Sequence, residues 1–218
     1  IMTTRFIAPF ALYAIAYADR GATVFVNPDD MTATAVLDLG TTDQPGHADN
    51  KAKLVLNKTA AYAALLHITS SPRNQQEVAE FLEDWAEEAC CFDEQGAIKT
   101  PLAIAAVRKI TIESAQKVES DAQILSATRS AFESIRASSK DPIPTLIHFT
   151  CQPYADLAER TFTLRLSVLT GDKAPKLVLR MQKAETHSEE MANELASRIE
   201  DAIGTELPVL VGQYSKAA

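Results

Sequence analysis

Apolar and polar residues alternate most clearly within residues 160–183, where the pattern predicts a β-hairpin. The apolar face of its two strands consists of Phe162, Leu164, Leu166, Val168, Leu177, Leu179 and Met181. Residues 170–175 between the strands supply Gly, Asp and Pro, which favour chain reversal. The second face is basic and carries Arg165, Lys176 and Arg180. One face of the hairpin is therefore suited to a protein core and the other to an anionic partner.

The same two-residue period predicts further strands before and after this hairpin in the sequence. They cover residues 23–27, 32–39, 51–57, 145–151 and 209–214. Helical spacing of apolar residues predicts helices over residues 3–18 and 58–68. Residues 113–140 contain few large apolar side chains and predict a partly exposed helix or a connector.

Capping signals place the remaining helices. Asn74 followed by Glu77 predicts a capping box, and the helix behind it continues to Ala89. The pair Thr100–Pro101 opens another helix, because proline is favoured at the first helical position. A second capping box, Thr186 with Glu189, predicts the start of a helix that Gly204 ends.

The two ends of the chain share one order of elements, three strands followed by a helix. Within it, Lys53-Leu54-Val55-Leu56 matches Lys176-Leu177-Val178-Leu179 letter for letter. Internal duplication and the general similarity of alternating strands both explain so short a match. We predict an α+β fold in which two antiparallel three-stranded β-β-β-α modules are joined by central helices. The modules cover residues 1–68 and 141–218, the central helices cover residues 69–140, and all belong to a single domain spanning residues 1–218.

Charge is strongly segregated along the chain. Residues 75–94 contain eight Asp and Glu and no Lys or Arg, a charge equal to the net −8 of the whole molecule. Residues 160–183 contain six Lys and Arg against one Asp. Two runs of opposite sign suit pairing between subunits, so we expect a homo-oligomer. The candidate interaction residues are Glu80, Asp84, Glu87, Glu88, Arg165, Lys176 and Arg180.

Nucleic acid is the alternative partner for the basic face. The net charge of −8 argues against a general nucleic-acid binder, since such domains are usually basic. A sheet with a basic face can nevertheless follow a phosphate backbone. The faces predicted to be basic carry no aromatic residue for base stacking, so only backbone contact is expected.

The sequence gives little evidence for a set of catalytic residues. Cys90, Cys91 and Cys151 form no Cys-x-x-Cys pair and are interpreted as free thiols in a reducing cytosol. His47 and Asp49 lie close together in a polar loop, which leaves a metal-dependent hydrolase as a weak alternative. We predict a protein that is not an enzyme and has no catalytic residue, metal or cofactor. No apolar run reaches the roughly 18–20 residues of a membrane span, so no membrane partner is expected.

A resemblance to a known family is carried by residues 25–39, 45–49, 79–85, 105–113, 126–130, 149–154 and 160–162. In these segments the chain resembles the YfdQ-like family of phage and prophage proteins. The resemblance implies a mobile-element origin and a bacterial cytoplasm, and it suggests that residues precede Ile1 in the family. It implies no activity. The expected function is a non-catalytic, self-assembling interaction or structural component, with an accessory role in phage DNA metabolism or recombination as the alternative.

Overall fold

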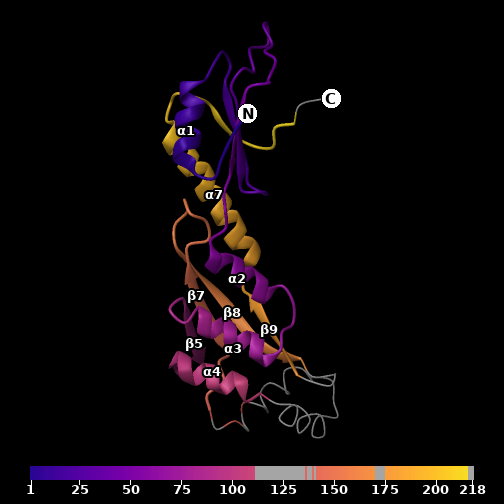
Figure 1. Ribbon diagram of the computed structural model, residues 1–218, viewed down its shortest axis with the longest axis vertical. Coiled ribbons are helices and arrows are strands. Elements are labelled where there is room, and N and C mark those ends of the chain that lie inside the picture. Colours follow the sequence, from indigo (N-terminus) through magenta and orange to yellow (C-terminus); the bar gives the residue numbers. More distant parts are fainter. Residues whose placement is uncertain (111–135, 137–138, 140, 170–174, 216–218) are drawn as a thin grey trace. The chain divides into compact units, whose positions relative to one another are not determined.

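The computed structural model describes residues 1–110, 136, 139, 141–169 and 175–215. The chain forms two compact units, each built from separate segments. The first unit contains residues 1–59, 153–158 and 183–218, and the second contains residues 60–152 and 159–182. In the part of the chain that is described, each unit holds one five-stranded sheet (Figure 1).

The sheet of the first unit combines antiparallel and parallel pairs. In spatial order it consists of β1 (Met2–Thr4), β4 (Lys51–Val55), β3 (Thr32–Val36), β2 (Thr23–Asn27) and β10 (Val209–Val211). The three central strands are antiparallel neighbours, whereas β1 and β10 join the two edges in parallel. The predicted alternation holds, since Ala33, Ala35, Ala52 and Leu54 are buried.

Two helices complete the first unit. Helix α1 (Ile7–Ala16) packs against α7 (Ala184–Ile203) and β4 (Figure 1). Pro9 is tolerated as the third residue of α1, because the first backbone N–H groups of a helix have no intrahelical partner. The buried stripe of α7 includes Met191, Leu195, Ile199 and Ile203, which is the set that helical spacing predicts, and Gly204 follows as its C-cap.

The sheet of the second unit is antiparallel throughout the described strands. In spatial order it consists of β6 (Gly96–Ile98), β5 (Ala89–Asp93), β7 (Leu146–Cys151), β8 (Arg160–Leu169) and β9 (Lys176–Met181). The predicted hairpin is confirmed, because β8 and β9 pair from Leu164 opposite Met181 to Leu169 opposite Lys176. Residues 170–174 of its predicted turn lie outside the described residues.

Three helices, α2 (Ala60–Thr69), α3 (Gln75–Asp84) and α4 (Thr100–Arg108), pack on one face of the second sheet. Tyr62 of α2 stacks on Phe162 of β8, with ring centroids 5.3 Å apart. Phe81 of α3 stacks on Phe149 of β7 at the same distance, 5.3 Å. The helices therefore cover the apolar face that the strand alternation predicts.

The α+β fold is confirmed, but each sheet has five strands where the sequence predicts three. Residues 89–98, predicted to be the end of a central helix and its connection, form β5 and β6 instead. Thr3 and Thr4, predicted to begin the first helix, belong to β1 (Met2–Thr4) instead. These short strands are stabilised by hydrogen bonds to partners far along the chain, which local periodicity does not reveal.

One capping prediction is confirmed and one is wrong. The side chain of Asn74 accepts a hydrogen bond from the Glu77 N–H at 2.9 Å, and the Glu77 carboxylate accepts one from the Asn74 N–H at 2.9 Å. Helix α7, by contrast, begins at Ala184, two residues before Thr186, and has no side-chain cap. The residue before it, Lys183, has φ of 52° and turns the chain directly out of β9.

The two antiparallel meanders, β2-β3-β4 and β7-β8-β9, share the pattern seen in the sequence. In the third strand of each, the Lys of the Lys-Leu-Val-Leu segment is exposed, both Leu residues are buried and the Val is half-buried. The helix that follows each meander, however, lies in the other unit: α2 follows β4 but belongs to the second unit, and α7 follows β9 but belongs to the first. The predicted segment 113–140 falls outside the described residues except at positions 136 and 139.

Candidate functional site

The second sheet has an open face, which we define as the side of its strands that points away from α2, α3 and α4. It consists of Cys90, Phe92, Leu146, His148, Thr150, Thr161, Thr163, Arg165, Ser167, Leu169, Lys176, Val178 and Arg180. None of these side chains is buried, whereas the residues that alternate with them form the core. The second unit thus presents a strand-lined surface that combines basic, hydroxyl and aromatic groups.

Two cations lie directly across from each other on this face. Arg165 of β8 is the register partner of Arg180 of β9, and both are exposed. Neither guanidinium forms a hydrogen bond or ion pair with any residue that the structure describes. Like charges directly opposite each other in a sheet are destabilising. The pair is therefore a local concentration of positive charge suited to an anionic partner.

Lys176, the third predicted cation, lies on the same face, opposite Leu169 and two residues from Val178. It is exposed and stands diagonally beside Ser167. The structure therefore brings all three basic candidates together on the outer part of the hairpin. Their spacing follows from alternation, since residues 176, 178 and 180 of one strand must point to one side.

An aromatic pair occupies the other part of the open face. The rings of Phe92 on β5 and His148 on β7 lie 4.7 Å apart at an interplanar angle of 47°. Phe92 pairs with Leu146, and Leu146 pairs with Arg165 on its other side. One cross-strand row therefore runs from Phe92 through Leu146 to Arg165 and Arg180.

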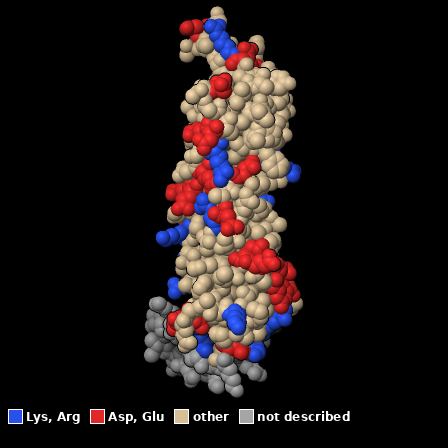
Figure 2. Space-filling view, turned by 90° about the vertical axis from the view of Figure 1, so that its left-hand side faces the viewer, with Lys and Arg blue, Asp and Glu red and all other residues tan. Residues whose placement is uncertain are grey.

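The acidic candidates lie on the helical layer of the second unit. Glu80 and Asp84 are exposed on α3, whose opposite side buries Phe81 against the sheet. Glu87 is exposed and Glu88 half-exposed in the turn that follows. In the lower part of Figure 2, which shows this unit, Asp and Glu residues form a continuous red area. The acidic residues of α3 and the basic residues of the open face thus lie on opposite sides of the sheet.

Carboxylates of α3 have polar partners within the unit. Glu80 accepts a hydrogen bond from the Gln76 side-chain amide at 2.7 Å. The neighbouring Glu83 forms an ion pair with Arg108 at 2.8 Å. The backbone carbonyl of Glu88 accepts a hydrogen bond from the Thr150 N–H at 2.9 Å, which continues the β5–β7 ladder. Glu88 therefore also has a structural role.

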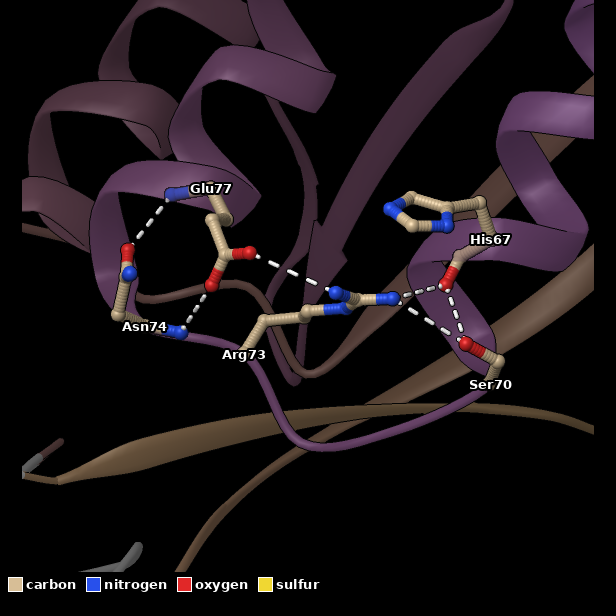
Figure 3. Close-up of polar contacts among 5 residues, drawn as sticks. All are labelled: His67, Ser70, Arg73, Asn74 and Glu77. Carbon is tan, nitrogen blue, oxygen red and sulfur yellow. Dashed lines mark hydrogen bonds and ion pairs between the residues drawn. The ribbon is translucent and has the colours of Figure 1, made fainter.

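Arg73 supports the edge of this sheet from the loop between α2 and α3 (Figure 3). Its guanidinium donates to the His67 carbonyl at 2.7 Å and to Ser70 Oγ at 3.2 Å, and it contacts Glu77 at 3.5 Å. Its backbone exchanges two hydrogen bonds, of 2.8 and 2.7 Å, with Leu177 of β9. Because β9 is the last strand of the sheet, this loop pairs with part of an edge that would otherwise be unpaired. The contacts hold in place the strand that carries Lys176 and Arg180.

The cysteines of this unit are poor nucleophiles where they are buried. Burial raises the pKa of Cys91 to about 12 and that of Cys151 to about 11. Both thiols are therefore protonated near neutral pH, and a thiol is far less nucleophilic than a thiolate. Cys90 is exposed on the open face beside its register partner His148.

His47 and Asp49 lie in the loop between β3 and β4 of the first unit, and both are exposed. The Asp38 carboxylate accepts hydrogen bonds from the backbone N–H groups of Asp49 at 3.3 Å and Asn50 at 3.1 Å. Among the described residues, no group of three or more His, Cys, Asp or Glu side chains could hold a metal ion. The described part of the loop thus gives the hydrolase alternative no ligand set.

Residues 1–214 match the family model of the uncharacterised conserved proteins DUF2303. The chain belongs to this family. No curated protein and no solved structure matches it. Within the described residues of this DUF2303 protein, no helix combines the length and apolar character needed to cross a bilayer.

Phe92 is the residue of the open face that the sequence pattern does not reveal. Its strand follows an acidic amphipathic helix so closely that Ala89 continues the helical spacing of Val78, Leu82 and Trp85. In the structure Ala89 and Cys91 are buried while Cys90 and Phe92 are not, an alternation that four consecutive apolar residues do not show in the sequence. The signal that the sequence does carry is the turn behind the strand, where Asp93 and Gly96 favour chain reversal and the Asp93 carboxylate accepts hydrogen bonds from the N–H groups of Gln95 and Gly96.

Proposed function

We propose that this DUF2303 protein is a non-catalytic accessory protein that contacts the backbone of nucleic acid through the open face of its second sheet. The observation that carries the proposal is the Arg165–Arg180 pair, in which two exposed guanidinium groups face each other across β8 and β9. Phosphate groups offset the repulsion between these cations, and the planar guanidinium matches phosphate geometry with two parallel hydrogen bonds. Lys176 extends the same basic surface.

The net charge of −8 is compatible with this proposal because the charge is distributed unevenly. The exposed carboxylates of α3 lie on the helical side of the sheet, away from Arg165 and Arg180. A phosphate backbone on the open face would therefore approach the cations without first meeting these acids. Screening over about 8–10 Å near physiological salt weakens repulsion from more distant charges.

An origin in a phage or prophage and a bacterial cytoplasm belong to the proposal as well. They are supported by the resemblance of residues 25–39, 79–85 and 149–154 to YfdQ-like proteins. An accessory role in phage DNA metabolism or recombination follows from combining that origin with a basic sheet face.

Replacing Arg165 and Arg180 together by Glu tests the nucleic-acid proposal. We expect the wild type to shift labelled DNA in a mobility assay and the double variant to bind the same DNA much more weakly. If both guanidinium groups contact phosphates, the slope of log Kobs against log salt falls by about two. The matched control carries Lys53→Glu and Lys99→Glu, which change the net charge equally at exposed positions off the open face. Binding that survives in the open-face variant, or that shows no salt dependence, contradicts the proposal.

Self-assembly is the second candidate, favoured by the placement of opposite charges on opposite sides of the second sheet. Because the acids of α3 and Arg165–Arg180 do not meet within a unit, they can meet only between copies. Such a contact joins two different surfaces and is heterologous, which builds rings where the rotation closes. In the first unit, Phe6, Leu12 and Tyr17 around α1 are more than half exposed, and exposed apolar side chains of this size favour an interaction component.

Charge reversal tests this second candidate. Glu80→Lys with Glu87→Lys is expected to reduce the particle mass measured by light scattering, because two copies then present cations to each other. Adding Lys176→Glu and Arg180→Glu restores complementarity and is expected to restore the mass. A contact made only by exposed charges weakens toward 1 M salt. A reversal that rescues nothing, or a monomer at every salt concentration, rejects assembly through these surfaces.

A further inference from the structure

We infer that the open face of the second sheet binds single-stranded nucleic acid, with bases stacked at Phe92 and His148 and phosphates held at Arg165 and Arg180. The inference rests on the proposed function and adds a substrate class and two residues to it. Its basis is the combination of an aromatic pair and a cationic pair in neighbouring positions of one solvent-accessible sheet face.

The aromatic pair is placed to receive a planar ligand. Phe92 and His148 come from adjacent strands, and their rings are 4.7 Å apart, so each limits the motion of the other. Both side chains are half-buried, so neighbouring residues of the sheet restrain them while part of each ring remains accessible to solvent. Their tilt of 47° leaves them unstacked on each other, and a base can contact either ring.

The cations lie at a useful distance from these rings. Neighbouring strands are about 4.8 Å apart, so Phe92 on β5 and Arg165 on β8 are separated by about 10 Å across β7. Arg180 on β9 lies one strand farther. A strand of nucleic acid that crosses the sheet therefore meets rings first and guanidinium groups next. Alternating contacts to bases and phosphates are the usual basis of binding single strands without sequence preference.

Hydroxyl groups line the remaining part of this path. Thr163 pairs with His148 across β7 and β8, and Ser167 stands diagonally beside Arg180. Thr150 and Thr161 are register partners, and their hydroxyl oxygens are 2.8 Å apart. Hydroxyls donate to phosphate and sugar oxygens and to base edges without selecting one base.

The face distinguishes a single strand from a duplex through its rings. In a duplex the planar faces of the bases are covered by their neighbours, so the rings of Phe92 and His148 have nothing to stack on. The arginines contact phosphates in either case. A duplex, or a polyanion without bases, therefore contacts only the arginines and not the rings. The acidic α3 of a second copy, the competing occupant, also uses only the arginines.

Fluorescence anisotropy with labelled oligo-dT, a duplex of the same length and inorganic polyphosphate tests the inference. We expect oligo-dT to bind the full chain most tightly. Phe92→Leu and His148→Gln, which remove the rings and keep similar volume and polarity, are expected to weaken oligo-dT binding by roughly 5- to 150-fold for each stacked base. The same variants leave polyphosphate binding unchanged. Tyr13→Leu, which removes a ring of the first unit that is half-buried like Phe92 and His148, is the matched control and keeps wild-type affinity.

The outcomes separate the inference from the proposed function. If wild-type protein binds all three probes equally and the ring variants change nothing, backbone contact stands and the inference is wrong. If none of the probes binds, both the inference and the proposed nucleic-acid function are wrong. If no probe binds but Arg165→Glu with Arg180→Glu reduces the particle mass, the face is occupied by a second copy.

A variant that gains a signal distinguishes loss of binding from loss of the folded structure. Phe92→Trp retains a stacking ring and adds a fluorophore on the open face, whereas the natural Trp85 lies against Phe149 on the covered side. Oligo-dT is expected to quench the added fluorescence and polyphosphate to leave it unchanged. Equal responses to the two probes overturn the assignment of the rings.

Discussion

Replacing Leu166 by Asp is expected to unfold the second unit or to leave it barely stable. Leu166 is only 2% exposed and lies opposite Leu179, which is also buried, in the central part of the β8–β9 hairpin. An unpaired carboxylate at this position costs about 4 kcal/mol or more, because it must be desolvated or protonated without a compensating partner. Total stabilities of domains are roughly 5–15 kcal/mol, so the change is of the same order.

The neighbouring Ser167→Asp is the matched control for the same charge. Ser167 lies on the open face, with Val178 directly opposite and Lys176 and Arg180 as diagonal neighbours. A carboxylate there remains solvated and approaches two cations, so the free energy of unfolding is expected to change by less than about 0.5 kcal/mol. Urea denaturation followed by circular dichroism measures both variants. Equal midpoints for the two would show that the assignment of faces along β8 is wrong.

Replacing Gly40 by Ala is expected to produce the second large loss of stability, in the first unit. Gly40 has φ of +77° and lies against the chain reversal at residues 44–46. A Cβ atom at this position would lie 2.2 Å from the backbone nitrogen of Gly46 and 2.4 Å from the carbonyl oxygen of Gln44. Backbone atoms cannot rotate away as a side chain does. Strain and displaced hydrogen bonds together are expected to cost about 2–5 kcal/mol.

Gly204→Ala separates the steric effect from the backbone conformation. Gly204 also has positive φ, +62°, as the residue that ends α7, but a Cβ there meets no atom within 4 Å. Only the conformational cost of about 1–3 kcal/mol is expected, because φ of 62° with ψ of −136° is a backbone conformation that residues other than glycine rarely adopt. Thermal unfolding of the two variants measures the difference. A Gly40→Ala variant as stable as Gly204→Ala would mean that the loop at residues 38–50 relaxes without penalty.

Local patterns predict the elements that are stabilised by their sequence neighbours. The β8–β9 hairpin, the capping box at Asn74 and the buried stripe of α7 all depend on residues close together in the chain. Elements that are too short to show a period and that depend on distant partners are not predicted. The strand β1 has only three residues and exists because it pairs with β4, about fifty residues away. β10 is recognised as a strand, but its parallel pairing with β2 does not follow from its pattern.

The candidate surface was predictable in part for the same reason. Alternation alone places Arg165, Lys176 and Arg180 on one side of the hairpin, and the structure confirms that all three are exposed there. The direct opposition of Arg165 and Arg180 depends on the register, which is not encoded in either strand by itself. The aromatic half of the surface requires β5, a strand that the preceding amphipathic helix obscures.

The placement of α2 and α7 has a consequence for synthesis on the ribosome. The meander β2-β3-β4 emerges early, but its flanking strand β10 and the helix that packs on α1 belong to residues 184–211, near the end of the chain. The first unit therefore stays incomplete until residue 211 has been made, while the segments of the second unit are all translated by residue 182. The unit that begins with residues 1–59 is thus completed after the other, and a polypeptide truncated shortly after β9 is expected to contain the open face without a complete first unit.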